Sequence, residues 1–281
     1  MSALSDAEFL FACFKNSGWL APQNLKRSLA VGDVCSLQNG QLHPLLNISG
    51  AHLVETADIS RPQALSSLDF CFSQGAQQVF IESGSVQDGA EQTILHHRQV
   101  IEFAGPGSFV FYTDQVSARY LLNWSEISAD LILKLTQLHY QFREAYVVTS
   151  VAVCNVWGLA VAGREEAMLE TTSASEESGM FSMLSHRSSH VGQAKGLARH
   201  EYGREQPGHL FRAKKLVPSE KAYDRYLRRV LDNQQVSRPL EVANWLQSDC
   251  LNLMRNNELT LNSCMELFSW RDALPDDFLF S

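Results

Sequence analysis

The chain has 281 residues, of which 45% are hydrophobic and 19% are charged. This composition is that of a folded globular protein and excludes a disordered chain, and the length suits one large domain or two small ones. The start of the chain has no basic stretch followed by an apolar core and a cleavage site, so we expect no signal peptide.

The six cysteines are scattered along the chain, and no two of them form a Cys-x-x-Cys pair. This spacing argues against a zinc framework and against a disulfide-rich scaffold. We therefore predict reduced thiols in a cytoplasmic protein.

The formal net charge of −8 is distributed unevenly. Residues 1–194 carry 10 basic and 19 acidic side chains, residues 195–229 carry 10 and 4, and residues 230–281 carry 3 and 8. An acidic tail thus directly follows a basic block. This asymmetry indicates either pairing within the molecule or a basic patch for an anionic surface, with a solvated helix face as the simpler interpretation.

The first predicted element is a helix. Ser5 and Glu8 form a capping box ahead of an apolar run, and Gly18 is placed to end the helix. Residues 19–60 read as short strands, with turn signals at residues 32–33 and 39–40.

The next part of the chain reads as a meander of antiparallel strands. A polar connector over residues 82–92 divides it, and residues 105–107 (GPG) form a turn. The predicted strands cover residues 68–72, 78–81, 99–103 and 108–112.

An amphipathic helix is predicted over residues 125–142. Its apolar side chains recur at spacings of three and four and form one face; they are Ile127, Leu131, Leu135, Leu138 and Phe142.

Residues 145–163 form the most apolar uncharged stretch of the chain. Its length is close to the ~20 residues of a helical membrane span. Six of its residues are Val, however, and Val favours strands. With Asn155 and Gly158 as interruptions, we predict two strands, at residues 146–154 and 157–162. Residues 164–170 continue as a more polar strand, and residues 171–178 read as an exposed loop tip.

The last part of the chain begins with a basic strand, residues 209–217, and continues with helices over residues 218–281. The first helix is predicted to turn Tyr223, Leu227, Val230 and Leu231 inward. The second begins at Pro239 and carries Leu246, Cys250 and Met254 at helical spacing, and the third covers residues 261–270. The predicted fold is α+β, a twisted, mostly antiparallel sheet with flanking helices, followed by a small all-helical C-terminal segment.

The sequence contains none of the common catalytic, nucleotide-binding or metalloprotease motifs. The chain has no GxSxG elbow, phosphate loop, GxGxxG or HExxH motif. His186 and His190 have a spacing that suits zinc, but the Ser and Gly around them do not support a helix and no third ligand follows. We therefore expect no catalytic residues, no metal and no cofactor. The acidic charge and the lack of a recognition motif also argue against a nucleic-acid partner.

The order of the predicted pieces is more informative than any single motif. A short helix leads into strands with a long polar connector, an amphipathic helix precedes a Val-rich strand, and helices close the chain. This order resembles the pore-forming domain of the gasdermin family over about residues 5–217. The segments that carry the resemblance are residues 145–151 (AYVVTSV), 178–184 (SGMFSML) and 207–217 (PGHLFRAKKLV).

The resemblance implies a pore-forming domain at residues 1–217 and an acidic, autoinhibitory helical segment at residues 218–281. Release of that segment would let many copies bind membrane lipids, unfurl two hairpin regions and close a barrel as a homo-oligomer at the membrane. Cutting by an activating protease is expected near residues 216–221 or 234–238. Gasdermins act as cell-death or defence effectors, and an antiviral role is included in that expectation.

The resemblance also implies roles for individual residues. Anionic headgroups would bind the basic strand through Arg212, Lys214 and Lys215. The insertion regions cover about residues 68–112 and 145–210, and the second includes Val147, Val148, Val151, Val153, Val156, Leu159 and Val161. The autoinhibitory segment would act through Leu227, Val230, Leu246 and Met254.

The chain departs from the family in two places. Compact bacterial members carry a lipidated Cys very near the N-terminus, whereas the first Cys here is Cys13, inside the predicted helix. Their inhibitory tails are also shorter than this one. The main alternative is a non-enzymatic interaction or structural module in which residues 145–162 are two buried central strands. An enzyme of another family is the third hypothesis.

Overall fold

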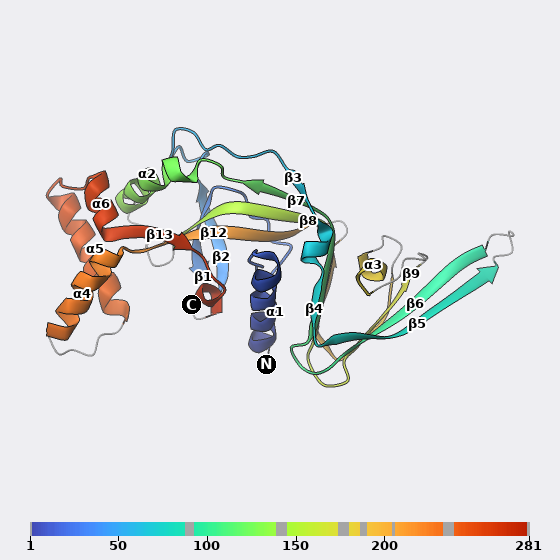
Figure 1. Cartoon of the computed structure of the whole chain (residues 1–281). Helices are drawn as coiled ribbons and strands as arrows, with labels where there is room; N and C mark the ends of the chain where they lie inside the picture. Colours follow the sequence, from blue (N-terminus) through green and yellow to red (C-terminus); the bar gives the residue numbers. More distant parts are fainter. Residues whose placement is uncertain are drawn as a thin grey trace. The chain divides into compact units, whose positions relative to one another are not determined.

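The computed structural model describes residues 2–87, 93–138, 145–173, 180–185, 190–203, 206–232 and 239–279. These residues form an α+β fold with a nine-stranded and a four-stranded antiparallel sheet and several helices, which confirms the predicted fold class (Figure 1).

The chain divides into two compact units. The first comprises Met1–Ser28, Pro62–Ala118 and Ala152–Leu210, and the second comprises Leu29–Arg61, Arg119–Val151 and Phe211–Ser281. The boundary predicted at residues 217 and 218 is a functional one, drawn on other grounds, and it stays a prediction.

The first unit begins with helix α1 (Ser2–Ser17), so Ser5 lies inside the helix and not at its predicted N-cap. Gly18 ends the helix as predicted, because it adopts a positive φ of 71° and its N–H donates to the carbonyl of Phe14. Phe9 of this helix packs on three phenylalanine rings, with centroid distances of 5.3 to 6.4 Å, and these are Phe72, Phe109 and Phe111.

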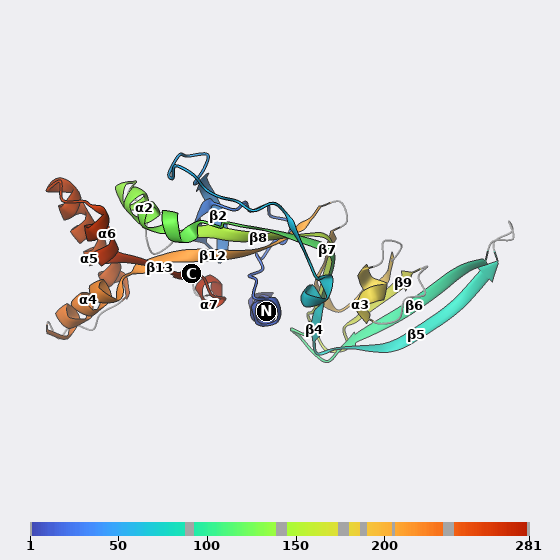
Figure 2. The ribbon, with the colours of Figure 1, turned by 45° about the horizontal axis from the view of Figure 1, so that its top comes forward.

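The four-stranded sheet of the first unit has the order β10-β9-β6-β5. Figure 2 shows β5 (Ala76–Gln87) and β6 (Thr93–Phe103) as a long hairpin, with β9 (Met168–Ser173) and the short helix α3 (Met180–Ser185) beside it. Strand β10 covers His190–Lys195. The predicted polar connector is therefore shorter than expected, because β5 extends to Gln87. The predicted loop tip is strand up to Ser173, and residues 174–178 lie outside the described ranges.

The remaining elements of the first unit include the short strands β3 (Gln63–Leu65) and β4 (Phe72–Gln74), which pair with β7 (Phe109–Tyr120). The 3₁₀ helix η1 (Ser67–Phe70) occupies most of the strand predicted at residues 68–72, so that prediction was wrong there. Strand β11 (Leu197–Gly203) pairs with β8.

Strand β8 (Tyr146–Ala162) is one continuous strand of 17 residues. The prediction of two strands was therefore wrong. Gly158 lies within the strand and makes room for the ring of Tyr112. A Cβ atom at this position would lie 2.3 Å from that ring, so the glycine serves packing and does not mark a break. Asn155 is tolerated because its side chain is exposed.

The sheet strands of the second unit follow the order β13-β12-β8-β1-β2. β1 (Asp33–Gln38) and β2 (Gln41–Asn47) form a hairpin with its turn at the predicted position, and Asn39 and Gly40 both have positive φ, at 52° and 72°. These angles are those of a type I′ turn. The other two strands are β12 (Gly208–Pro218) and β13 (Phe268–Asp272).

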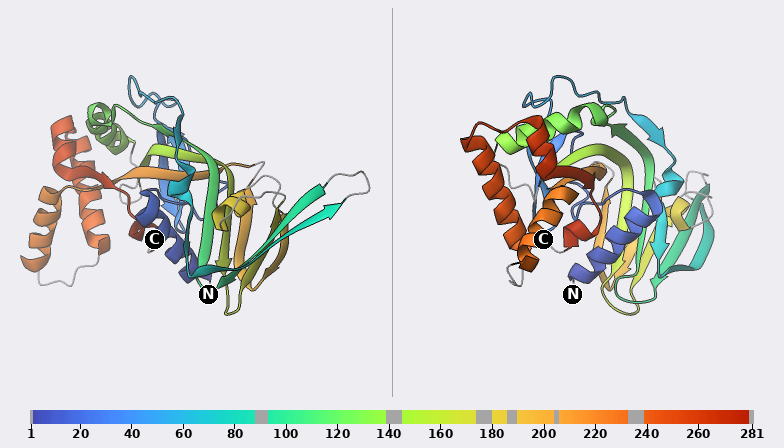
Figure 3. Two further views of the ribbon diagram at one scale, coloured as in Figure 1. Left: turned by 45° about the vertical axis from the view of Figure 1, so that its right-hand side comes forward. Right: turned by 60° about the vertical axis from the view of Figure 1, so that its left-hand side comes forward.

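The helices of the second unit gather in one group, with α4, α5 and α6 beside one another (Figure 3) and α2 against α6. They are α2 (Trp124–Gln137), α4 (Glu220–Asp232), α5 (Pro239–Arg255), α6 (Leu261–Leu267) and the short α7 (Asp276–Leu279). Helix α2 confirms the amphipathic prediction at Ile127, Leu131 and Leu135, which are buried. The prediction was wrong at Leu138, which follows the end of the helix and is 49% exposed, and Phe142 lies outside the described residues. None of the described helices has the length and apolar character of a membrane span.

The C-terminal segment differs from the prediction in one element. It is not all helical, because the third helix ends at Leu267 and the next five residues form strand β13. This strand pairs antiparallel with β12 and occupies the end of the sheet.

Candidate functional site: the C-terminal segment on strand β12

The basic strand β12 and the acidic tail meet in an antiparallel ladder. The register places Lys214 opposite Asp272 and Lys215 opposite Arg271, and it continues to Pro218 opposite Phe268. Lys214 Nζ lies 2.9 Å from a carboxylate oxygen of Asp272. Because the Asp272 side chain is 74% exposed, this pair contributes little to stability by itself.

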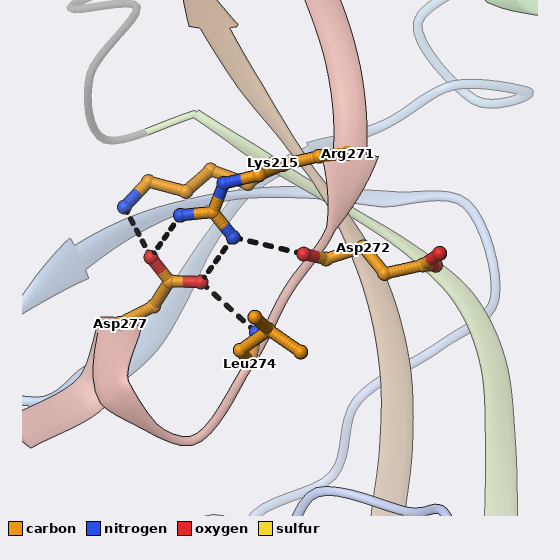
Figure 4. A network of polar contacts seen from close by, with 5 residues as sticks. All are labelled: Lys215, Arg271, Asp272, Leu274 and Asp277. Carbon is orange, nitrogen blue, oxygen red and sulfur yellow. Dashed lines mark hydrogen bonds and ion pairs between the residues drawn. The ribbon is translucent and has the colours of Figure 1, made fainter.

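Lys215 belongs to a more buried cluster centred on Asp277 (Figure 4). Its Nζ donates to Oδ1 of Asp277 over 2.6 Å. The guanidinium of Arg271 donates to both carboxylate oxygens, over 2.5 and 2.7 Å, and the N–H of Leu274 donates to Oδ2 over 2.9 Å. Four hydrogen bonds from three groups therefore hold a carboxylate whose side chain is only 6% exposed.

This environment favours the ionised form of Asp277. Burial by itself raises the pKa of Asp277, but the hydrogen bonds from Arg271, Leu274 and Lys215 and the charge of Lys215 lower it to about 2. Hydrogen bonding to Asp277 likewise raises the pKa of Arg271. The carboxylate of Asp277 is thus ionised at neutral pH.

Phe278, the residue after Asp277 in α7, packs on aromatic rings of β8 and β12. Its ring lies 5.7 Å from the ring of Tyr146 in β8 and 5.8 Å from the ring of Phe211 in β12. Lys215 also lies over the Tyr146 ring, with Nζ 5.3 Å from the centroid. One ionic and one aromatic contact from adjacent residues therefore hold α7 against β8 and β12.

A hydrophobic cluster holds the rest of the segment in place. It joins the first residue of the Val-rich stretch, Ala145, and Leu216 of β12 to α2 and to the C-terminal helices; its other buried members are Ile132, Ala222, Tyr226, Leu246, Cys250, Cys264, Leu267 and Phe268. Trp270 of β13 meets the ring of Trp124 edge to face, at an interplanar angle of 73°, and donates from Nε1 to the carbonyl of Ser128 over 2.8 Å.

The three residues assigned to lipid headgroups all lie on β12, in different surroundings. Arg212 is exposed, whereas Lys214 and Lys215 are half-buried under the contacts just described. The structure therefore brings two of the three basic residues together with acidic residues of the tail.

The residues assigned to membrane insertion all lie on β8. Val147, Val148 and Val161 are fully buried, and Val151, Val156 and Leu159 are nearly so, while Val153 is half-buried. Residues of both faces of the strand are covered, as expected for a central strand.

The residues assigned to autoinhibition are divided. Leu246 is buried in the cluster and Met254 is half-buried, and the side chain of Val230 lies outside the described residues, as does that of Leu231. The predicted inward face of α4 was wrong at Tyr223 and Leu227, which are 52% and 41% exposed. The helix instead buries the neighbouring face.

The buried face of α4 consists of Ala222 and Tyr226, four residues apart. Tyr226 holds α4 against α5, because its hydroxyl lies 2.6 Å from a carboxylate oxygen of Asp249 and its ring packs on Trp245. A rotation by one residue separates the observed face from the predicted one.

The first expected protease segment is exposed at Glu220 and Lys221 and half-buried at Val217 and Pro218. Within residues 216–221, Leu216 is fully buried and Ser219 is 8% exposed. Ser219 also donates to the carbonyl of Glu266 over 2.5 Å. The second expected segment, residues 234–238, lies outside the described residues.

The end strands of the four-stranded sheet carry exposed apolar side chains. Val79, Phe80 and Ile81 of β5 are 45, 44 and 49% exposed, and Val191 of β10 is 42% exposed. Three consecutive exposed apolar residues on an end strand are unusual in a soluble protein unless they serve binding.

All six cysteines are free thiols. Cys13 is fully buried, and burial raises its pKa to about 12. Among the described residues, no group of three His, Cys, Asp or Glu side chains is placed to hold a metal ion. The histidine pair at residues 186 and 190, which the sequence argued against as a zinc site, falls partly on undescribed residues.

Sequence reasoning missed Arg271, Asp277 and Phe278, which form the ionic cluster and the aromatic contact at α7. The alternation of apolar and polar residues in Phe268-Ser269-Trp270-Arg271 was a signal for the strand that presents Arg271. In comparisons with known proteins, no family model and no curated protein matches this chain.

Proposed function

We propose that this protein is an autoinhibited membrane-permeabilising protein whose C-terminal segment covers its lipid-binding strand. Release of the segment exposes Lys214 and Lys215, beside the already exposed Arg212, to anionic lipids, and several copies then assemble in the membrane. We also propose that the protein is related to the gasdermin family, that its inactive form is cytoplasmic, and that it acts as a cell-death or defence effector.

The observation that carries the proposal is the pairing of β13 and Asp277 with β12. Two of the three basic residues expected to bind headgroups have an acidic partner from the tail, at 2.9 Å for Lys214 and 2.6 Å for Lys215. The tail thus neutralises Lys214 and Lys215 of the basic block, which is what an inhibitory segment must do to a headgroup site.

The exposed apolar residues on β5 and β10 support the membrane part of the proposal. They lie on the two end strands of the four-stranded sheet, where a second copy can add a strand on either side. Val79, Phe80 and Ile81 also give β5 apolar side chains on both faces, which suits contact with lipid.

Dye release from anionic vesicles tests the proposal. The chain ending at Val217 is expected to release the dye, and the full chain is expected to release little. Failure of the shortened chain, in a folded state shown by circular dichroism, would favour the alternative. That alternative is an interaction or structural module, and the burial of both faces of β8 is the observation that favours it.

A further inference from the structure

Asp277 occupies a site that is built for an anion. Lys215 from β12, Arg271 from β13 and the N–H of Leu274 converge on its two carboxylate oxygens (Figure 4). The donors belong to three different segments, so they form a cup around the anion and not a single surface pair.

We propose that this cup is a binding site for the phosphate of an anionic lipid headgroup, and that Asp277 is its internal occupant. The inference rests on the proposed function and adds a trigger to it. A phosphate that binds Lys215 and Arg271 displaces the carboxylate, and α7 leaves β8 and β12 with it.

The chemistry of the donors suits a phosphate better than a carboxylate. A guanidinium fork matches two phosphate oxygens, and a phosphate monoester carries about −1.5 to −2 charges and a third acceptor oxygen. That oxygen can accept from Lys215 while Arg271 holds the other two. The monoester phosphate of a phosphoinositide headgroup therefore competes for the same donors at an advantage in charge over the carboxylate.

The three charged side chains of the cluster differ in exposure, and this difference sets the order in which a phosphate would meet them as it replaces the carboxylate. The side chain of Arg271 is 40% exposed, that of Lys215 is 17% exposed and that of Asp277 is 6% exposed. An approaching headgroup therefore meets Arg271 first. Once Asp277 has left, the charged groups at the site are Lys214, Lys215, Arg271 and the opposing Asp272, which leaves the site positive.

The aromatic contact couples this exchange to the strands beneath. Phe278 follows Asp277 directly and covers Tyr146 and Phe211. When the carboxylate loses its four hydrogen bonds, the packing of Phe278 remains as the side-chain contact of α7 with β8 and β12. Headgroup binding at β12 thus uncovers the first residue of β8.

Amide hydrogen exchange of residues 274–279 in the full chain tests the proposal. The chain is mixed with phosphatidylcholine vesicles, with phosphatidylcholine vesicles containing phosphatidylinositol phosphate, or with inorganic phosphate. We expect exchange on the order of tenfold faster with the phosphoinositide vesicles, which is the effect of losing one charge-assisted hydrogen-bond cluster. Equal rates with both kinds of vesicle would overturn the proposal, and equal acceleration by inorganic phosphate would overturn the lipid as the source.

Two variants make the test specific. Arg271→Lys keeps the charge and removes the fork, so the acceleration by phosphoinositide is expected to shrink. Arg255→Lys, on the exposed end of α5, is the matched control and is expected to respond like the natural chain. An unchanged response in Arg271→Lys would contradict the site. Leakage is not part of this readout, so failure here leaves the dye-release test of the proposed function intact.

Discussion

Lys215 and Asp277 are 62 positions apart in the sequence, and their charged atoms lie 2.6 Å apart. The charge asymmetry of the sequence allowed pairing within the molecule, a basic patch for a partner, or a solvated face. The structure shows pairing within the molecule for Lys214 and Lys215, and it leaves Arg212 exposed.

Replacing the carboxylate should weaken the hold on α7. We expect Asp277→Asn to lower the free energy of unfolding by about 2 kcal/mol, because a buried, charge-assisted cluster loses its anion. Urea denaturation followed by circular dichroism measures the change. Asp276→Asn is the control, since Asp276 is the exposed neighbour in the same helix, and equal losses in both variants would contradict the assignment.

The same carboxylate should make the tail sensitive to acid. The pKa of Asp277 is lowered from an ordinary 3.8 to about 2, so its contribution to stability is complete above about pH 4 and is lost as the pH falls toward 2. The difference in unfolding free energy between the natural chain and Asp277→Asn should therefore shrink between pH 5 and pH 2. A constant difference over this interval would mean that Asp277 does not titrate as an ion-paired group.

The aromatic contact is expected to matter as much as the ionic one. Phe278→Ala should cost about 3 kcal/mol, because the ring is 7% exposed and packs on Tyr146 and Phe211. Leu274→Ala, at a side chain that is 42% exposed, should change stability by less than about 0.5 kcal/mol. Thermal unfolding of both variants decides whether α7 is held by Phe278.

The continuity of β8 can be tested at its glycine. Gly158→Ala should destabilise the protein by about 2 kcal/mol or more, since the new Cβ meets the Tyr112 ring. Gly84→Ala is the control, because nothing lies within 4 Å of a Cβ there. A second change, Tyr112→Ala, should make Gly158→Ala harmless, and the absence of such rescue would show that the ring is not the obstacle.

Local signals in the sequence predicted several elements well. The turn at Asn39 and Gly40 and the end of α1 at Gly18 follow from positive φ angles that Gly and Asn favour, and the apolar face of α2 follows from helical spacing. These features depend on residues close together in the chain, so a pattern is enough to find them.

The misses depend on contacts between distant residues. Gly158 looked like a strand break because the Tyr112 ring that requires it comes from another strand. Residues 268–270 looked helical because the partner that makes them a strand, β12, lies about 50 positions earlier. The inward face of α4 was set by the contacts of Tyr226 with Asp249 and Trp245, and spacing alone did not favour that face over its neighbour.

The most direct test of the central claim is to cut the folded full chain in the presence of dye-filled vesicles. A specific protease site placed within residues 233–238 separates α4 from α5, α6, β13 and α7 without removing any of them beforehand. The claim predicts little leakage before the cut, rapid leakage from anionic vesicles after it, and much less when Arg212, Lys214 and Lys215 are all changed to Gln. Cut protein that stays folded, loses its C-terminal fragment and leaves anionic vesicles intact would contradict the claim.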